Sequence, residues 1–341
     1  MKYLLVGDVH ADLDNLDESR RLIRWIVPLV KKYGALPIFM GDQYSKMAII
    51  RAEVLEFWVW AYNHINAELS GNEYDINSIS LVGNHDLNSD GSASSMRAHA
   101  KQTMLAPASA DTAISKNIAA IGYTRDNDTF IKMAQAAYRD GVRTILCHAE
   151  FNGAKYDNGF YAPQGIDLES CPPVLFISGH IHTKQEIKSE FTKVLYVGTP
   201  RQLTRSDIGE VKGVHLWETD TNEMEFIPTP ADVAEPFQQI TITSEVQLAT
   251  IPNSPRVYVD VHGSADFIKK TLKKMPESAK VRTFPDQERS PIEIKESDGI
   301  PAAFVAFSNK YFIKKALDDN TKKNALSIIY EKCPALRGNN G

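Results

Sequence analysis

Short apolar runs recur through the first two thirds of the chain, and most of them end at a glycine followed by a polar residue. They are rich in Val, Ile, Leu and Phe and lie at residues 2–8, 36–42, 78–84, 143–150, 174–180 and 193–200. Continuous rather than alternating hydrophobicity is typical of strands buried on both faces. Helical periodicity fills residues 15–33 and 47–69 between the first runs. Strands that alternate with helices predict an α/β sandwich.

The pattern changes near residue 230. Residues 213–230 alternate around a D-T-N turn, which predicts a hairpin that closes the first unit. Beyond it, residues 236–262 have the pattern of strands and residues 264–276 that of a helix. Residues 291–300 resemble a loop, and residues 310–333 are helical again. A chain of 341 residues exceeds the usual size of a single core. We therefore expect one domain over residues 1–230 and a smaller α+β domain over residues 231–341.

Composition and charge restrict the setting and the partners. Three cysteines, Cys147, Cys171 and Cys333, form no disulfide framework, which favours a reducing cytoplasm. No apolar run is long enough to span a bilayer, so no membrane is expected. Residues 1–230 hold 22 basic against 29 acidic side chains, whereas the whole chain has a net charge of −5. A polyanionic substrate would therefore have to be held by something other than bulk lysine.

Five of the apolar runs end in residues that commonly bind metal ions. Their motifs read GDVH, GDQ, GNHD, CHAE and GHIH, and the predicted ligands in them are Asp8, His10, Asp42, Asn84, His148, His180 and His182. The carboxyl ends of strands in an α/β sheet are where ligands collect. A glycine before each of the pairs Asp8/His10 and His180/His182 lets the backbone turn sharply and lets an ion approach. Any one motif is a weak signal, but five in this arrangement predict a metal site.

Three oxygen donors and four imidazoles suffice for two divalent ions that share one carboxylate. Asp42 stands alone in its motif and is the expected bridge. Two neighbouring ions can clamp a phosphoryl group and lower the pKa of a bridging water. The mixture of nitrogen and oxygen donors predicts Mn²⁺, with Fe or Zn²⁺ as alternatives, over Ca²⁺ or Mg²⁺. His85 directly follows Asn84, so we expect it to donate a proton to the leaving group.

The ordered motifs resemble those of the calcineurin-like metallophosphoesterase superfamily, and the resemblance covers residues 1 to about 228. It implies a four-layer sandwich, with two mixed sheets flanked by helices. It also implies two ligand sets that share Asp42. One set is Asp8, His10, Asp42 and His182; the other is Asp42, Asn84, His148 and His180. His85 resembles the general acid of the family.

Within that superfamily the chain is most similar to the SbcD-type nucleases of DNA recombination and repair, especially phage ones. The segment YVGTPRQLTRSD and the hairpin at 213–230 carry this likeness. It implies an exonuclease or endonuclease subunit with DNA as substrate and a coiled-coil SbcC-type ATPase as partner. It further implies that the protein is located in the cytoplasm of a bacterium or of a phage-infected cell. A homodimer is compatible with the resemblance. Arg201 and Arg205 follow the Gly-Thr-Pro turn and are candidate contacts for substrate phosphate.

Some residues depart from that branch and keep a second function open. Ala11-Asp12 replaces its usual Leu-Gly, Gln43–Ser45 replaces its Leu-Phe-Asp, and the helping histidine shortly after is missing. These departures favour a nucleotide or another small phosphoester as the alternative substrate. Protein Ser/Thr phosphatases look less similar, because Ala11 and Val82 break their motifs. A non-catalytic binding subunit ranks last, since every ligand position is filled.

Overall fold

The computed structural model describes residues 1–286 except residues 48, 71–76, 92–93 and 163. The chain divides into two compact units: Met1–Asp260 with Lys274–Arg282, and Val261–Lys273 with the chain from Thr283 onward. The domain boundary expected near residue 230 remains a prediction. The loop expected at 291–300 and the helix expected at 310–333 lie outside the described residues.

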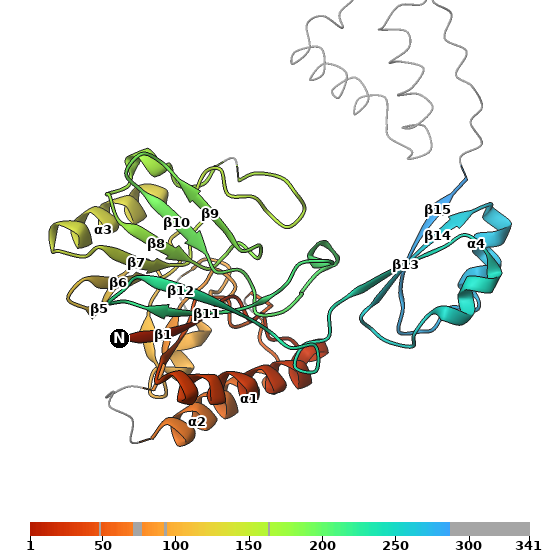
Figure 1. Cartoon of the computed structure of the whole chain (residues 1–341), viewed down its shortest axis with the longest axis horizontal. Helices are drawn as coiled ribbons and strands as arrows, with labels where there is room; N and C mark the ends of the chain where they lie inside the picture. Colours follow the sequence, from red (N-terminus) through yellow and green to blue (C-terminus); the bar gives the residue numbers. More distant parts are fainter. Residues whose placement is uncertain (48, 71–76, 92–93, 163, 287–341) are drawn as a thin grey trace, which may run out of the picture. The chain divides into compact units, whose positions relative to one another are not determined.

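Two six-stranded mixed sheets form the first unit, as expected (Figure 1). The first has the order β12-β11-β1-β2-β3-β4, with β1 to β4 parallel and β11 antiparallel to both β1 and β12. Its strands are β1 (Lys2–Val6), β2 (Leu36–Phe39), β3 (Ile79–Leu81), β4 (Met104–Ala106), β11 (Gly213–Glu218) and β12 (Glu223–Pro228).

The second sheet has the order β5-β6-β7-β8-β10-β9, and its four central strands are parallel. Its strands are β5 (Asp111–Ser115), β6 (Ile118–Ile121), β7 (Thr144–Cys147), β8 (Leu175–Ser178), β9 (Gln185–Lys188) and β10 (Lys193–Tyr196). The edge strands β5 and β9 pair antiparallel with their neighbours. Both are partly exposed and carry few apolar residues, which is why hydrophobic runs did not predict them.

Helices cover the outer face of each sheet, and three apolar clusters separate the four layers. Helices α1 (Leu16–Tyr33) and α2 (Ala52–Leu69) pack on the first sheet, and α3 (Asn127–Arg139) packs on the second. Strand β1 shows the principle, because Leu4 and Val6 face the helices while Tyr3 and Leu5 face the other sheet. Successive side chains of a strand point to opposite faces, so burial on both faces requires a continuous apolar run. The four-layer sandwich is confirmed.

The remaining elements are short. The hairpin predicted at 213–230 forms from β11 and β12, and Asn222 turns the chain with a φ of 57°. The helix predicted from residue 47 begins at Ala52. Further along the chain lie β13 (Gln238–Ile242), β14 (Val257–Gly263), α4 (Ala265–Leu272) and β15 (Lys280–Pro285), and the three strands form one sheet in the order β13-β14-β15.

Five 3₁₀ helices connect these elements in the described residues: Leu13–Asn15, Ser95–His99, Leu168–Ser170, Arg205–Asp207 and Glu245–Thr250. Among the helices of the described part of the chain, none has both the length and the apolar content to cross a membrane.

Candidate metal centre

The predicted ligands all follow the carboxyl ends of parallel strands. Asp8 and His10 come after β1, Asp42 after β2, Asn84 after β3, His148 after β7, and His180 with His182 after β8. The two sheets pack face to face, so these strand ends meet at one edge of the sandwich. Three groups of donor atoms there lie within 4.8 Å of one another: Asp8, His10, His182; His10, Asp42, His85; and Asp42, His148, His180.

Asp42 lies between the two predicted ligand sets. Its Oδ2 atom is 3.6 Å from Nε2 of His10 and 3.4 Å from Nε2 of His148. Its Oδ1 atom accepts a hydrogen bond of 2.8 Å from the backbone N–H of His85, which fixes the carboxylate. One oxygen therefore faces imidazoles from both sets, which is the arrangement required of a bridging carboxylate.

On one side of Asp42 the donors are Asp8, His10 and His182. The Nε2 atoms of the two histidines lie 3.1 Å apart, and Nε2 of His182 is 3.9 Å from Oδ2 of Asp8. Asp8 is fully buried, and its Oδ1 atom has no hydrogen-bond partner among the described residues. A buried carboxylate oxygen without a partner is costly unless a cation neutralises it.

On the other side Asn84, His148 and His180 converge. Oδ1 of Asn84 is 3.0 Å from Nε2 of His148 and 2.9 Å from Nδ1 of His180. The other ring nitrogen of His148 lies 2.9 Å from the carbonyl oxygen of Met40, to which it can donate. That hydrogen bond leaves the Nε2 lone pair of His148 facing Asn84 and Asp42, as a metal ligand requires.

Three of the converging residues have a left-handed backbone, with φ values of 47° at His10, 51° at Asp42 and 78° at His180. Such values are uncommon for residues other than glycine, and strain of this kind clusters at functional sites. Hydrogen bonds hold two of them: the N–H of His10 donates to the carbonyl of Asp42 at 2.9 Å, and the N–H of His180 donates to Oδ2 of Asp8 at 2.9 Å. The ligand loops therefore support one another.

The glycines of the motifs are required by close packing. An added Cβ atom at Gly83 would lie 2.2 Å from Oδ1 of Asp42, and one at Gly41 would lie 2.2 Å from Nδ1 of His148. At Gly179 it would lie 2.6 Å from Oδ1 of Asp8 and 2.5 Å from the carbonyl oxygen of Met40. The donor side chains occupy the space that a larger residue would need.

The electrostatics of the cluster favour a cation. Burial raises the pKa of Asp8 to about 8, despite the opposing effect of His148. Burial alone would lower the pKa of His148, but the charges of Asp42 and Asp8 outweigh it and raise that pKa to about 10. Burial opposes ionisation of Asp42 as well, yet the surrounding histidines hold its pKa below the usual value. Two buried carboxylates at one place demand positive charge, so the residues present fit divalent metal ions.

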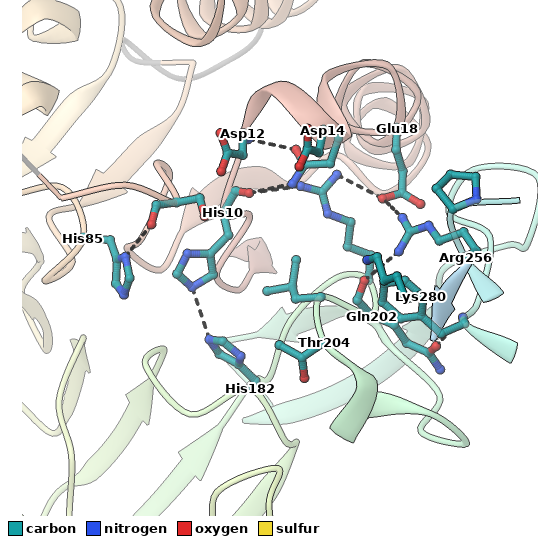
Figure 2. A pocket seen from close by; sticks show the side chains of 16 residues that line it. His10, Asp12, Asp14, Glu18, His85, His182, Gln202, Thr204, Arg256 and Lys280 are labelled. Carbon is teal, nitrogen blue, oxygen red and sulfur yellow. Dashed lines mark hydrogen bonds and ion pairs between the residues drawn. The ribbon is translucent and has the colours of Figure 1, made fainter. Parts of the chain in front are cut away.

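His85 lies at the rim of the cluster. Its ring is 4.8 Å from that of His10, and its Nδ1 atom is 2.7 Å from the carbonyl oxygen of Ser45. A hydrogen bond from Nδ1 to that carbonyl turns Nε2 away from Ser45. His85, His10 and His182 line one side of a cavity of about 560 Å³, as Figure 2 shows, with Glu18, Arg256 and Lys280 on the other side.

The two arginines proposed for substrate contact are held by protein groups. Arg201 is buried, and its guanidinium donates to the carbonyl of Val9 at 2.7 Å and to Oγ of Ser19 at 2.8 Å, with Glu18 as ion-pair partner. Arg205 pairs with Asp260 at 2.5 Å. Arg201 therefore braces the loop that carries His10. Contact of either arginine with substrate remains a prediction.

The sequence analysis predicts no role for two carboxylates that lie beside the cluster. Asp86, in the GNHD motif, accepts from the N–H of Tyr44 at 3.1 Å and from the N–H of Gly83 at 2.9 Å, so it ties two ligand loops together. Glu150 lies 3.6 Å from His180. Each carboxylate lies two residues after a predicted ligand, and this spacing is the sequence signal that could have identified them.

Residues 1–184 match the family model described as calcineurin-like phosphoesterase. "Exonuclease subunit 1" of Enterobacteria phage T4 is 28% identical over 250 residues, which cover 67% of this chain and 68% of that protein.

Two solved structures are also similar. An archaeal phosphodiesterase is 13% identical, with a TM-score of 0.35, over 67% of this chain and 100% of the other. Yfce, a phosphoesterase from E. coli, is 12% identical, with a TM-score of 0.34, over 67% of this chain and 98% of the other. Because both TM-scores are low, family membership rests on the match over residues 1–184.

Replacing Gly179 with alanine should disrupt the site without unfolding the sandwich. Its φ is outside the left-handed region, so the effect is steric: the new methyl group meets the backbone carbonyl oxygen of Met40 and the side chains of Asp8 and His148. We expect Mn²⁺ binding, measured by calorimetry, to weaken at least tenfold.

The control is Gly34→Ala at the end of α1. Gly34 has a φ of 58°, and an added Cβ atom there would meet no heavy atom of the described residues within 4 Å. It should cost about 1 kcal/mol of stability and leave Mn²⁺ binding intact. Equal Mn²⁺ affinity in both variants would contradict the steric account.

Proposed function

The chain belongs to the calcineurin-like phosphoesterase family, and on that premise we propose that it is a two-metal phosphodiesterase that cleaves DNA. Members of this family are metal-dependent phosphoesterases, and this chain is one of them. The observation that carries the two-metal proposal is the position of Asp42, whose Oδ2 atom faces His10 at 3.6 Å and His148 at 3.4 Å. One carboxylate oxygen thus serves both sets of donors.

We assign the ligands by these two sets. Asp8, His10, Asp42 and His182 would hold one ion, and Asp42, Asn84, His148 and His180 the other. When bound, such ions polarise a phosphoryl group and lower the pKa of a coordinated water to near neutrality. The donor set of imidazole, carboxylate and amide favours Mn²⁺, with Fe or Zn²⁺ as alternatives.

His85 is assigned the role of proton donor to the leaving oxygen. The carbonyl of Ser45, 2.7 Å from Nδ1, orients the ring. Nε2 is then the atom that can donate toward a substrate in the cavity that His85 lines. Among the charged residues around that cavity, Arg256 and Lys280 would attract a phosphate backbone.

DNA is proposed as substrate because the phage T4 relative is named as an exonuclease subunit. The word subunit in that name also supports a partner, for which a coiled-coil SbcC-type ATPase is our proposal. The excess of acidic residues in the first 230 positions favours a partner that supplies much of the grip on DNA. A role in DNA recombination or repair, in the cytoplasm of a bacterium or phage-infected cell, follows from the same proposal.

A nucleotide or another small phosphoester is the second candidate substrate. The segment after Gly41-Asp42 of the sequence has no histidine, whereas the SbcD-type nucleases that the sequence resembles often have one there, and this difference favours the small substrate. The two candidates share the metal centre and differ only in what the cavity accepts.

Cleavage of linear DNA in Mn²⁺ tests the proposal directly. We expect the full chain to cut DNA, and Asp8→Ala and His180→Ala to reduce the rate by at least a factor of about 10³, because each removes a ligand. Glu186→Gln, a surface change on β9, is the control and should keep the full rate. Unchanged cleavage in both ligand variants would end the proposal. Hydrolysis of bis-p-nitrophenyl phosphate without action on DNA would favour the small phosphoester.

Replacing His85 with asparagine separates proton donation from metal binding. We expect the rate on DNA to fall by a factor of about 10² or more, since the sugar oxygen must be protonated as it leaves. Nitrophenolate is a much better leaving group, so the rate on bis-p-nitrophenyl phosphate should fall far less. Mn²⁺ binding by calorimetry should stay at the wild-type level. An equal loss on both substrates would remove His85 from the role of acid.

A further inference from the structure

Glu150 is a charged group beside the metal centre that the proposed chemistry leaves without a role. Its Oε2 atom lies 3.6 Å from Nε2 of His180. The opposite nitrogen of the same ring, Nδ1, lies 2.9 Å from Oδ1 of Asn84. The two ring nitrogens of His180 therefore have different neighbours: Nδ1 faces the cluster of predicted ligands, and Nε2 faces the carboxylate of Glu150.

Tyr156 holds that carboxylate in place. Its hydroxyl donates to the same Oε2 atom of Glu150. Burial, followed by the effect of Glu150, raises the pKa of Tyr156 to about 12, so the hydroxyl keeps its proton at neutral pH. The backbone of Tyr156 is itself fixed, because its N–H donates to the carbonyl of Phe160 at 2.8 Å and its carbonyl accepts from Gly159 at 2.9 Å.

The backbone of Glu150 is anchored as well. Its carbonyl accepts a 2.8 Å hydrogen bond from the N–H of Ile166, beside the bridge between Phe151 and Ile166. Glu150 directly continues the segment that carries His148, so one short stretch supplies both a predicted ligand and the group that faces another. The position of its carboxylate is thus set by three elements of the fold: β7, the turn at Tyr156 and the chain at Ile166.

We propose that Glu150, secured by Tyr156, is a positioning residue that keeps the proton of His180 on Nε2 and turns the Nδ1 lone pair toward the metal centre. A neutral imidazole can bind a metal through only one nitrogen, and a carboxylate at the other nitrogen fixes which one and raises the basicity of the ring. The inference rests on the proposed function, because it needs His180 to be a metal ligand.

A purely structural role for Glu150 is disfavoured by its surroundings. Its side chain is 25% exposed, and its carboxylate contacts polar groups, the ring of His180 and the hydroxyl of Tyr156, rather than the apolar core. It also belongs to none of the donor groups that lie within 4.8 Å of one another in the described residues, so it is not placed as a ligand itself. What remains is its effect on His180.

Calorimetric titration of the full chain with Mn²⁺ tests the role. Glu150→Gln keeps an oxygen acceptor but loses the charge, and should weaken one of the two Mn²⁺ sites by about 10-fold. Glu150→Ala loses both and should weaken that site by about 100-fold. Tyr156→Phe should have a smaller effect of the same sign. Saturating Mn²⁺ should restore kcat in all three variants, because a positioning residue is not itself needed in the chemical step.

Glu186→Gln provides the matched control, since it makes the same chemical change on the surface strand β9. Wild-type Mn²⁺ affinity in Glu150→Ala would overturn the inference, as would a loss of kcat that saturating Mn²⁺ does not restore. Failure of the proposed function is distinguishable, because the wild-type chain would then bind fewer than two Mn²⁺ ions or His180→Ala would leave both sites intact.

Discussion

The carboxylates of Asp8 and Asp42 are buried beside four imidazoles, and the arrangement of the surrounding side chains depends on how their negative charge is balanced. An isolated buried carboxylate is very costly, so a fold that places two together must surround them with donors or with positive charge. Backbone N–H groups of His180 and His85 satisfy part of this demand. The remaining oxygens, Oδ1 of Asp8 and Oδ2 of Asp42, face imidazole nitrogens of His148 and His10. This is the arrangement that the proposed two-metal site requires.

The rest of the fold delivers these groups to one place. Parallel strands of both sheets end at the same edge, so segments as distant as β1 and β8 contribute neighbouring donors. Left-handed backbone at His10, Asp42 and His180 then turns the chain sharply after each strand. Such strain persists only where the surroundings hold it, and here the loops hold one another through hydrogen bonds, glycine packing and the buried guanidinium of Arg201. These contacts fix the positions of the donor side chains relative to one another.

The buried strands and the polar residues at their carboxyl ends could be predicted from the sequence. Strands buried on both faces need continuous apolar runs, so β1, β2, β7, β8 and β10 were visible, and the polar residues directly after them located the site. The edge strands β5 and β9 lack such runs because they are partly exposed. The role of Arg201 could not be read from its neighbours in sequence, since its partners Val9 and Glu18 lie far away along the chain. The same holds for Glu150, whose contact with His180 exists only after folding.

Anomalous diffraction from a crystal soaked in Mn²⁺ would show whether two metal ions share Asp42. We expect two anomalous peaks within about 4 Å of each other, one toward His10 and one toward His148, with the carboxylate of Asp42 between them. A single peak, or two peaks of which neither contacts Asp42, would contradict this expectation.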